Sequence, residues 1–295
     1  MKRTIVALFA LLFGASAAAG EDWDRFVERT VEDNSAGIEC LAGIPGTVGG
    51  TPVQNVGAYG QEVSTSIFRV RAFDVEAKDF VEFTAEECGF RYRQSRFNSA
   101  DRGRYIVTRV DYRLTVDGRP TVRYADLERA LEQQAAERNG SQTEHRNGQQ
   151  TAPPSLAEVA RVVRRVRQAK GMLLVEGDPD CRSAGSFFKN PVVGKERVRH
   201  VTEVSGKQPP CFPVGSDLRN SDQVKLPAAW LVEQAGFSKG YVLGAAGVSS
   251  RHTLALINRG GASAAQILAL AGEINQSVEA RFGIHLEMEP VMVGF

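Results

Sequence analysis

The most constraining feature of this sequence is a glycine-rich segment, residues 37–60, which reads GIECLAGIPGTVGGTPVQNVGAYG and contains seven glycines. Glycine at this density lets the backbone approach a ligand closely and expose its N–H groups. The segment is not a Walker loop, because no GK[ST] follows it, and the GxxGxxG spacing of Gly43, Gly46 and Gly49 differs from the GxGxxG of dinucleotide-binding folds. Two interpretations stay open on composition alone: a phosphate-binding loop, and a tight loop whose glycines serve packing.

Regular secondary structure is predicted on both sides of this segment. Apolar residues recur at helical spacing from Trp23 to Val31, behind acidic residues that suit a helix N-terminus, and predict a short amphipathic helix. Residues 68–72 and 106–114 alternate between apolar and polar side chains. This alternation predicts two strands of a sheet that has one wetter face.

Capping boxes mark two further helices in the second half of the chain. Ser155 and Glu158 open a helix with an apolar stripe and a basic opposite face. Ser263 and Gln266 open another, which runs to a glycine. Side chains alternate again at residues 284–288, which predicts a strand after this helix.

A polar stretch separates the two halves of the chain. Residues 128–154 are dominated by Gln, Asn, Glu and Arg after one short helical stretch, which is typical of a surface excursion or linker. The chain has 295 residues, 42% of them hydrophobic, so it can bury a core, and its length favours two domains. We therefore predict an α+β fold in two parts, with a boundary near residue 155.

Charge and cysteine spacing argue against several functions. Thirty-six Lys and Arg balance 35 Asp and Glu, and a net charge of +1 offers no general attraction to nucleic acid, so we expect no nucleic-acid partner. The four cysteines and four histidines are scattered, without CxxC or HExxH, so we expect no metal site. Buried thiols are the default for these cysteines, and an exported chain could form up to two disulfides of undetermined pairing.

The N-terminus has the features of a secretory signal. Residues 1–18 contain two basic residues, an apolar run from Ile5 to Phe13, and small residues after it. The run is shorter than the roughly 18 to 20 apolar residues that cross a bilayer, so we expect no stable membrane span. The stretch is interpreted as a signal-like leader or a misassigned start, and the alternative is a buried strand and turn at the beginning of a cytoplasmic domain.

Three places combine reactive side chains with glycines or aromatic residues. They are CGFRYRQSRF at residues 88–97, SAGSFFKNP at residues 183–191, and Glu289 in front of a proline. Each has an ordinary explanation when taken alone: a solvated strand edge, a turn, and an exposed strand end. No triad order or paired-carboxylate spacing follows from them, so the residues by themselves identify no reaction.

Taken in order along the chain, five blocks resemble those of one enzyme family. GIPGTVGGTPVQNVGAYG, FRYRQSRF, AGSFFKNP, AAWLVEQAGFSKG and LEMEPV are similar to successive blocks of the UDP-N-acetylenolpyruvoylglucosamine reductases (MurB, or UDP-N-acetylmuramate dehydrogenases), from about Ala19 to Phe295. The sequence YADL, residues 124–127, is similar to the loop that marks the type I branch. The resemblance implies a PCMH-type FAD-binding domain at residues 19–154 and a substrate-binding α+β domain at residues 155–295.

The resemblance also implies an activity. The family consists of cytoplasmic FAD enzymes that use NADPH to reduce UDP-N-acetylglucosamine enolpyruvate to UDP-N-acetylmuramate for peptidoglycan synthesis. Arg93 and Glu289 match the residues that stabilise the developing charge, and Ser186 matches the proton donor. We also expect a monomer.

The remaining matched residues are binding residues. Those that would contact the flavin are Gly43, Ile44, Pro45, Gly46, Thr47, Gln54, Asn55, Gly57, Ala58 and Tyr59. Those that would contact the substrate are Tyr92, Tyr124, Lys170 and Asn190.

One block of the family pattern has no counterpart in the sequence. Family members carry a GGGSN-type loop for the FAD diphosphate ahead of the point where this sequence joins the pattern, at Ala19. We therefore expect weak FAD binding or none. The alternative function is a truncated, non-catalytic protein that binds a UDP-sugar or glycan and is possibly exported.

Overall fold

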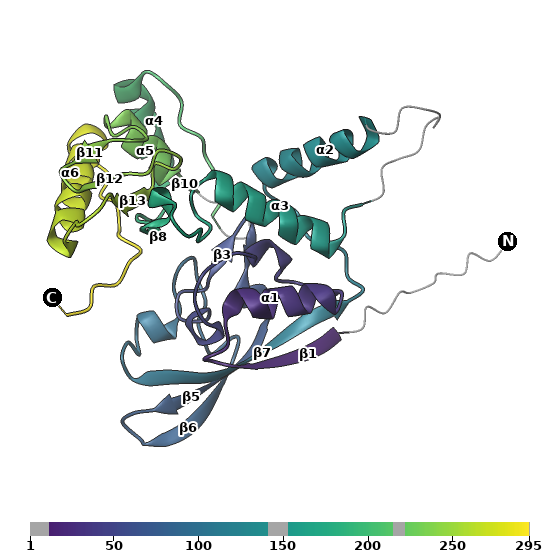
Figure 1. Cartoon of the computed structure of the whole chain (residues 1–295). Coiled ribbons are helices and arrows are strands. Elements are labelled where there is room, and N and C mark those ends of the chain that lie inside the picture. Colours follow the sequence, from purple (N-terminus) through teal and green to yellow (C-terminus); the bar gives the residue numbers. More distant parts are fainter. Residues whose placement is uncertain (1–11, 141–152, 215–221, 295) are drawn as a thin grey trace. The chain divides into compact units, whose positions relative to one another are not determined.

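The computed structural model describes residues 12–140, 153–214 and 222–294 (Figure 1). The chain divides into two compact units, Met1–Arg167 and Gln168–Phe295, and each has its own hydrophobic core. Both units combine helices with antiparallel sheet, as the α+β prediction requires. The division lies after Arg167, whereas the sequence predicted it at residue 155.

The first unit is built on an antiparallel sheet with strand order β1-β7-β5-β6, and β2 also pairs with β7. The bounds of its elements are β1 Leu12–Ala18, α1 Trp23–Glu32, β2 Ser35–Ala36, β3 Gly57–Ala58, β4 Gln61–Glu62, β5 Ile67–Asp74, β6 Asp79–Thr84, β7 Tyr105–Val116, α2 Ala125–Gly140 and α3 Leu156–Ala169. The strands predicted at residues 68–72 and 106–114 are confirmed as β5 and β7.

Residues 12–18, which were interpreted as part of a signal-like leader or a misassigned start, form a strand of the folded unit. Strand β1 pairs antiparallel with β7 along its whole length, from Leu12 opposite Thr115 to Ala18 opposite Arg109. The chain then continues into the core, because the Gly49 N–H donates to the Ala19 carbonyl over 2.9 Å. The described part of this stretch is therefore a strand, as the alternative interpretation expected, although only Ala17 in residues 14–18 is buried. Residues 1–11 lie outside the described residues.

Helix α1 covers the sheet through its aromatic residues. Trp23 and Val27 are almost completely buried, and the rings of Trp23 and Phe26 lie 6.0 and 5.1 Å from that of Tyr112 on β7. Asp22 caps the helix by accepting the Arg25 N–H. Burying side chains of this size contributes about 1.5–3 kcal/mol each, which fixes α1 on the inner face.

The predicted helix after Ser155 is confirmed as α3, but most of it belongs to the first unit. Ser155 and Glu158 form the expected capping contacts, at 2.8 and 3.2 Å. The apolar stripe of α3, including Val159 and Val163, is buried in the core of the first unit. The polar excursion begins with a longer helix than expected, α2, and its residues 141–152 lie outside the described residues.

The second unit packs one long helix against a four-stranded sheet with the order β11-β12-β13-β8. The bounds of its elements are β8 Ser183–Ser186, β9 Val192–Gly194, α4 Lys195–Ser205, β10 Gln223–Lys225, α5 Ala228–Gln234, β11 Val242–Leu243, β12 Ala246–Val248, β13 Ala255–Asn258 and α6 Ala264–Phe282. The capping box of Ser263 and Gln266 is present at the start of α6.

The strand predicted at residues 284–288 is wrong. Ile284 and Leu286 are buried, as the alternation suggested. Only Met288 pairs, in an isolated bridge to Phe188 just after β8. The segment therefore lies beside the end of β8 but is too irregular to form a strand. The alternation of side chains predicted which residues are buried, but a strand also needs a neighbouring strand to pair with.

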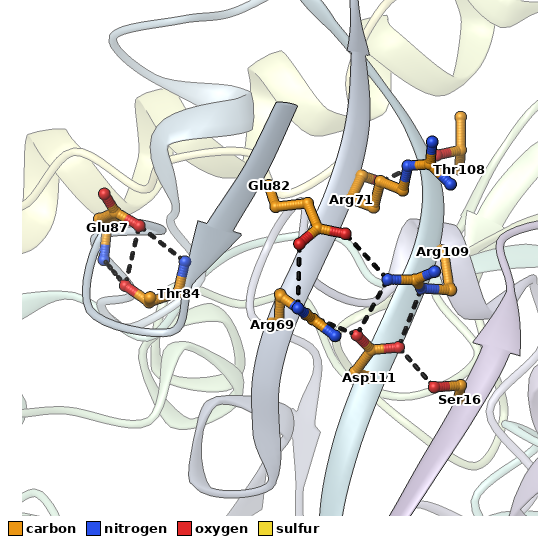
Figure 2. Close-up of polar contacts among 9 residues, drawn as sticks. All are labelled: Ser16, Arg69, Arg71, Glu82, Thr84, Glu87, Thr108, Arg109 and Asp111. Carbon is orange, nitrogen blue, oxygen red and sulfur yellow. Dashed lines mark hydrogen bonds and ion pairs between the residues drawn. The ribbon is translucent and has the colours of Figure 1, made fainter. Parts of the chain in front are cut away.

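One face of the first sheet carries a polar network in which several donors bind a single carboxylate. Asp111 on β7 accepts from the Ser16 hydroxyl at 2.6 Å and the Arg69 guanidinium at 2.8 Å, and Arg109 lies beside it (Figure 2). Burial acts to raise the pKa of Asp111, but the bonds from Ser16 and Arg69 outweigh it and lower that pKa. Because Ser16 contributes to this network, β1 is tied to the sheet by side chains as well as by its backbone.

Candidate active site

The loop of residues 43–47 is held from both sides by charged residues of helices α1 and α3. The Gly43 N–H donates to the Asp24 carboxylate at 2.6 Å, and its carbonyl accepts from the Arg167 guanidinium at 3.1 Å. Arg164 of α3 pairs with Asp24 at 2.5 Å, so the two helices fix the loop together. Gly43 has φ +75°, a conformation that favours glycine.

The far end of this loop is open. A Cβ atom added to Gly46 would meet nothing within 4 Å, and Pro45, Gly46 and Thr47 are exposed. The N–H groups of Gly46 and Thr47 have no acceptor among the described residues. Exposed backbone N–H groups beside open space suit the polar edge or phosphate oxygens of a bound flavin, so this loop fits the cofactor.

A tight hairpin presents Tyr59 next to this loop. Strands β3 and β4 are joined by Tyr59 and Gly60, whose φ angles are +51° and +80°. The Tyr59 ring meets that of Tyr124 edge to face at 5.5 Å, and Arg167 hydrogen-bonds to its hydroxyl. Burial raises the pKa of Tyr59 to about 12, so its hydroxyl stays protonated.

A second tight turn carries Tyr92 and Arg93. Arg91 and Gln94 pair across it, and Arg93 has φ +53°. The Arg93 guanidinium donates to the Gly57 carbonyl at 2.6 Å and lies 5.3 Å from the centre of the Tyr92 ring. Arg93 is therefore half-buried against the hairpin and keeps a fixed direction.

Asn55, one of the predicted flavin-binding residues, has a buried side chain. It is 1% exposed, and its amide is used entirely within the protein. Its Nδ2 donates to Glu62 at 2.9 Å and to the Arg91 carbonyl at 3.0 Å, and its Oδ1 accepts the Ser64 N–H at 3.1 Å. The side-chain amide of Asn55 is therefore occupied within the protein, and a flavin contact through its backbone stays a prediction.

In the second unit, Ser186 and Glu289 lie on adjacent backbone segments. Ser186 ends β8 and pairs with Ala255 of β13. The Glu289 N–H donates to the carbonyl of Phe187, the residue after Ser186, at 2.9 Å. This bond places the Ser186 and Glu289 segments side by side, although the two positions lie 103 apart in the numbering (289 − 186).

Asn190 has a structural partner. Its Oδ1 accepts the Ala228 N–H at 2.9 Å. This bond satisfies one of the backbone donors that have no partner within helix α5. Only its amide nitrogen is left for the substrate contact that the resemblance implies.

Lys170 lies directly after α3, beside a loop that the sequence did not single out. Arg251 in this loop donates to the Gln168 carbonyl at 3.0 Å, and the Gly240 N–H donates to Ser249 at 3.1 Å. Lys170 and Lys239 therefore flank His252. Burial, followed by these two lysines, lowers the pKa of His252 to about 4. No motif marked His252, because a lone histidine has no sequence signature.

The predicted residues thus form two groups. The first unit contains the flavin loop, the hairpin, Tyr124 and the turn with Arg93. The second contains Lys170, Ser186, Asn190 and Glu289. The four cysteines, all within the described residues, form no disulfide with one another. No helix in residues 12–140, 153–214 or 222–294 combines the length and apolarity that crossing a membrane needs.

Comparison with known proteins defines the class first. Residues 12–76 match the model of an FAD binding domain, and this match begins at β1, ahead of the join that the sequence suggested at Ala19. Residues 178–293 match the model described as UDP-N-acetylenolpyruvoylglucosamine reductase, C-terminal domain. The chain is therefore a flavin-dependent oxidoreductase that carries a separate α+β domain.

The relatives then identify the family. The chain is 45% identical over 284 residues to UDP-N-acetylenolpyruvoylglucosamine reductase of Thermobifida fusca, covering 94% of this chain and 73% of the relative. It is 41% identical over 276 residues to the reductase of Paraburkholderia xenovorans, covering 93% and 72%. The chain belongs to the UDP-N-acetylenolpyruvoylglucosamine reductase family. These matches support the enzyme over the alternative of a non-catalytic binding protein.

A solved structure agrees at the level of the fold. The crystal structure of UDP-N-acetylenolpyruvylglucosamine reductase (MurB) from Thermus caldophilus superposes with a TM-score of 0.55 at 23% identity, and the match covers 93% of this chain and 71% of that one.

Proposed function

We propose that this chain reduces UDP-N-acetylglucosamine enolpyruvate to UDP-N-acetylmuramate with NADPH as the electron source. The observation that carries the proposal is the 45% identity over 94% of the chain to a reductase of that name. FAD, when bound, supplies the chemistry of hydride transfer from the nicotinamide to the substrate. The loop of residues 43–47 and the hairpin at residues 57–60 are the parts of the first unit that would hold it.

Arg93 is proposed to stabilise negative charge on the substrate. Hydride addition to the enolpyruvyl group places charge on the carbon next to the carboxylate, and a fixed guanidinium is suited to that charge. The bond from Arg93 to the Gly57 carbonyl holds the guanidinium in one direction before substrate arrives. Such preorganisation lowers the cost of reorienting the group during the reaction.

Ser186 and Glu289 are proposed to complete the reduction. Ser186 donates a proton to the carbanionic carbon, and its hydroxyl needs assistance because serine is a weak acid in water. Glu289 lies on the segment adjacent to Ser186 and is proposed to act on the developing charge. An ionised carboxylate would repel that charge, so Glu289 is proposed to act as a protonated acid or through a proton network.

Substrate binding is proposed to involve Tyr92, Tyr124, Lys170 and Asn190. A lysine and an amide nitrogen are suitable donors to the oxygens of a diphosphate. We place the reaction in the cytoplasm, where UDP-sugars and NADPH are found, and propose that the chain acts as a monomer.

The test compares two arginines of the same turn. Arg93→Ala should lower kcat for substrate reduction by roughly 100-fold or more, the usual effect of removing an electrostatic stabiliser. Arg91→Ala is the matched control, because the Arg91 side chain is exposed on the same turn and should leave kcat within about 2-fold. Equal activities of the two variants would contradict the role of Arg93.

The role of Ser186 has a sharper readout. In Ser186→Ala, NADPH should still bleach the flavin absorbance, while reoxidation by UDP-N-acetylglucosamine enolpyruvate should slow strongly. Normal reoxidation would refute the assignment of Ser186 as proton donor.

A further inference from the structure

Three hydrogen bonds join the segment of residues 53–57 to the turn that carries Arg93. The Ser95 hydroxyl donates to the Val53 carbonyl at 2.6 Å, Asn55 donates to the Arg91 carbonyl at 3.0 Å, and Arg93 donates to the Gly57 carbonyl at 2.6 Å. The partners on the first segment are spaced two residues apart. The turn is therefore held at its beginning, at its functional residue and at its end.

Asn55 is the residue on which this arrangement depends most. Its backbone is left-handed, with φ +47°, a conformation in which asparagine is among the few tolerated side chains. Its amide bonds three groups on two other pieces of chain: the Glu62 carboxylate and the Ser64 N–H on the segment at β4, and the Arg91 carbonyl on the turn. It is almost completely buried, so water cannot replace these bonds without a rearrangement.

Space around Gly57 is too tight to absorb a shift of either segment. A Cβ atom at Gly57 would lie 2.7 Å from Glu62 Cγ and 3.1 Å from Arg93 Nη1. The hairpin and the Arg93 side chain are thus in direct contact, and both are linked to the Asn55 amide. A change in the position of the turn must therefore change the position of the guanidinium.

We infer that Asn55 is a positioning residue of the reductase, which sets the Arg93 guanidinium through the backbone of the turn at residues 91–95 and does not itself touch flavin or substrate. This inference rests on the proposed function, since it gives Arg93 its task. It assigns to the side chain of Asn55 a role apart from the flavin contact that the resemblance implies for this block.

The decisive variant is Asn55→Gly, which removes the amide but keeps a residue that tolerates positive φ. Asn34→Gly is the matched control. Asn34 also has a left-handed backbone, with φ +51°, and its Nδ2 also donates to a carboxylate, that of Asp117 at 2.6 Å. It is exposed and has no contact with the turn. Both variants lose an asparagine amide at positive φ, but only the first loses the tie to Arg91.

In the full chain with FAD, Asn55→Gly should lower kcat by roughly 10- to 100-fold, because a shift of about 1 Å in a catalytic group can cost 100-fold. The KM for NADPH should stay within about 2-fold. Asn34→Gly should leave both parameters within about 2-fold, with activities normalised to flavin content. A kcat of Asn55→Gly equal to that of Asn34→Gly would overturn the inference.

Asn55→Asp is the second variant in case the glycine variant does not fold. The aspartate keeps the acceptor for the Ser64 N–H but loses both donors and faces the carboxylate of Glu62. Protonation would restore one donor, so the ratio of its kcat to that of the wild type should rise as the pH falls from 8 to 6. A ratio near 1 that does not depend on pH would contradict the role.

Amide hydrogen exchange separates this inference from the proposed function. Residues 91–95 should exchange faster in Asn55→Gly than in Asn34→Gly or the wild type. An inactive wild type would refute the proposed function, yet exchange would still test the link from Asn55 to the turn. Unchanged exchange in this turn would refute that link.

Discussion

His252 should make the stability of this protein sensitive to mild acid. Its imidazole is partly buried beside Lys170 and Lys239, and burial, followed by the two positive charges, lowers its pKa from 6.5 to about 4. The folded protein therefore resists protonation of this side chain, while the unfolded chain does not. His252→Gln replaces the imidazole with a neutral side chain that does not titrate.

The sign and size follow from the two pKa values. Above about pH 6.5 His252 is neutral in both the folded and the unfolded state, so its titration does not change the free energy of unfolding. As the pH falls from 6.5 toward 4, the unfolded chain takes up a proton that the folded one does not, so stability is lost through this window. At about 1.4 kcal/mol per pKa unit, the loss of stability is about 3 kcal/mol below pH 4 and about 2 kcal/mol at pH 5.

The assay is urea unfolding of the wild type and His252→Gln at pH 7.5 and pH 5, followed by circular dichroism. The free energy of unfolding of the wild type should fall by about 2 kcal/mol more than that of the variant between these two pH values. His285→Gln is the control, because His285 is a mostly exposed histidine at the end of α6. Parallel pH profiles for the wild type and His252→Gln would refute the reasoning.

Two further predictions concern the first unit. Asp24→Ala removes the acceptor of the Gly43 N–H and the partner of Arg164, so it should lower the free energy of unfolding by about 1–3 kcal/mol in a denaturant titration and weaken flavin retention; unchanged values for both would contradict the anchoring role. Gly57→Ala places a Cβ atom 2.7 Å from Glu62 Cγ, so kcat should fall roughly 10-fold, whereas Gly194→Ala, where a Cβ atom meets nothing within 4 Å, should have no effect on it.

Local patterns predicted the regular elements of this fold well. Helices α1, α3 and α6 and strands β5 and β7 follow directly from periodicity and capping residues, because these signals depend on residues close together in the chain. The capping box at Ser263 shows the strength of such evidence, since both of its hydrogen bonds are present.

Features that depend on distant partners could not be predicted in this way. The apolar N-terminal stretch is suitable for a signal peptide or a strand, and its sequence alone does not reveal that residues 12–18 pair with the distant strand β7. The end of the first unit was misplaced because the apolar stripe of α3 does not reveal which core it enters. At residues 284–288 the alternation was real, but strand formation needed a partner that is present only at Met288.

The candidate site shows the same division. Family blocks pointed to Arg93, Ser186 and Glu289 and to the glycine loop. They could not distinguish side chains that would contact ligands from side chains that only stabilise the fold. Asn55 stands in a flavin-binding block, yet its amide is consumed by contacts within the protein. His252 was missed because its environment is formed by lysines that precede it by 82 and 13 positions in the numbering.

The most direct test of the account is the visible absorption of the purified 295-residue chain supplied with FAD, before and after NADPH and then UDP-N-acetylglucosamine enolpyruvate. The account predicts bound flavin bands that bleach with NADPH and recover when the substrate is added. A protein that binds the UDP-sugar but retains no flavin, or whose reduced flavin is not reoxidised by the substrate, would contradict the claim that this chain is a working reductase.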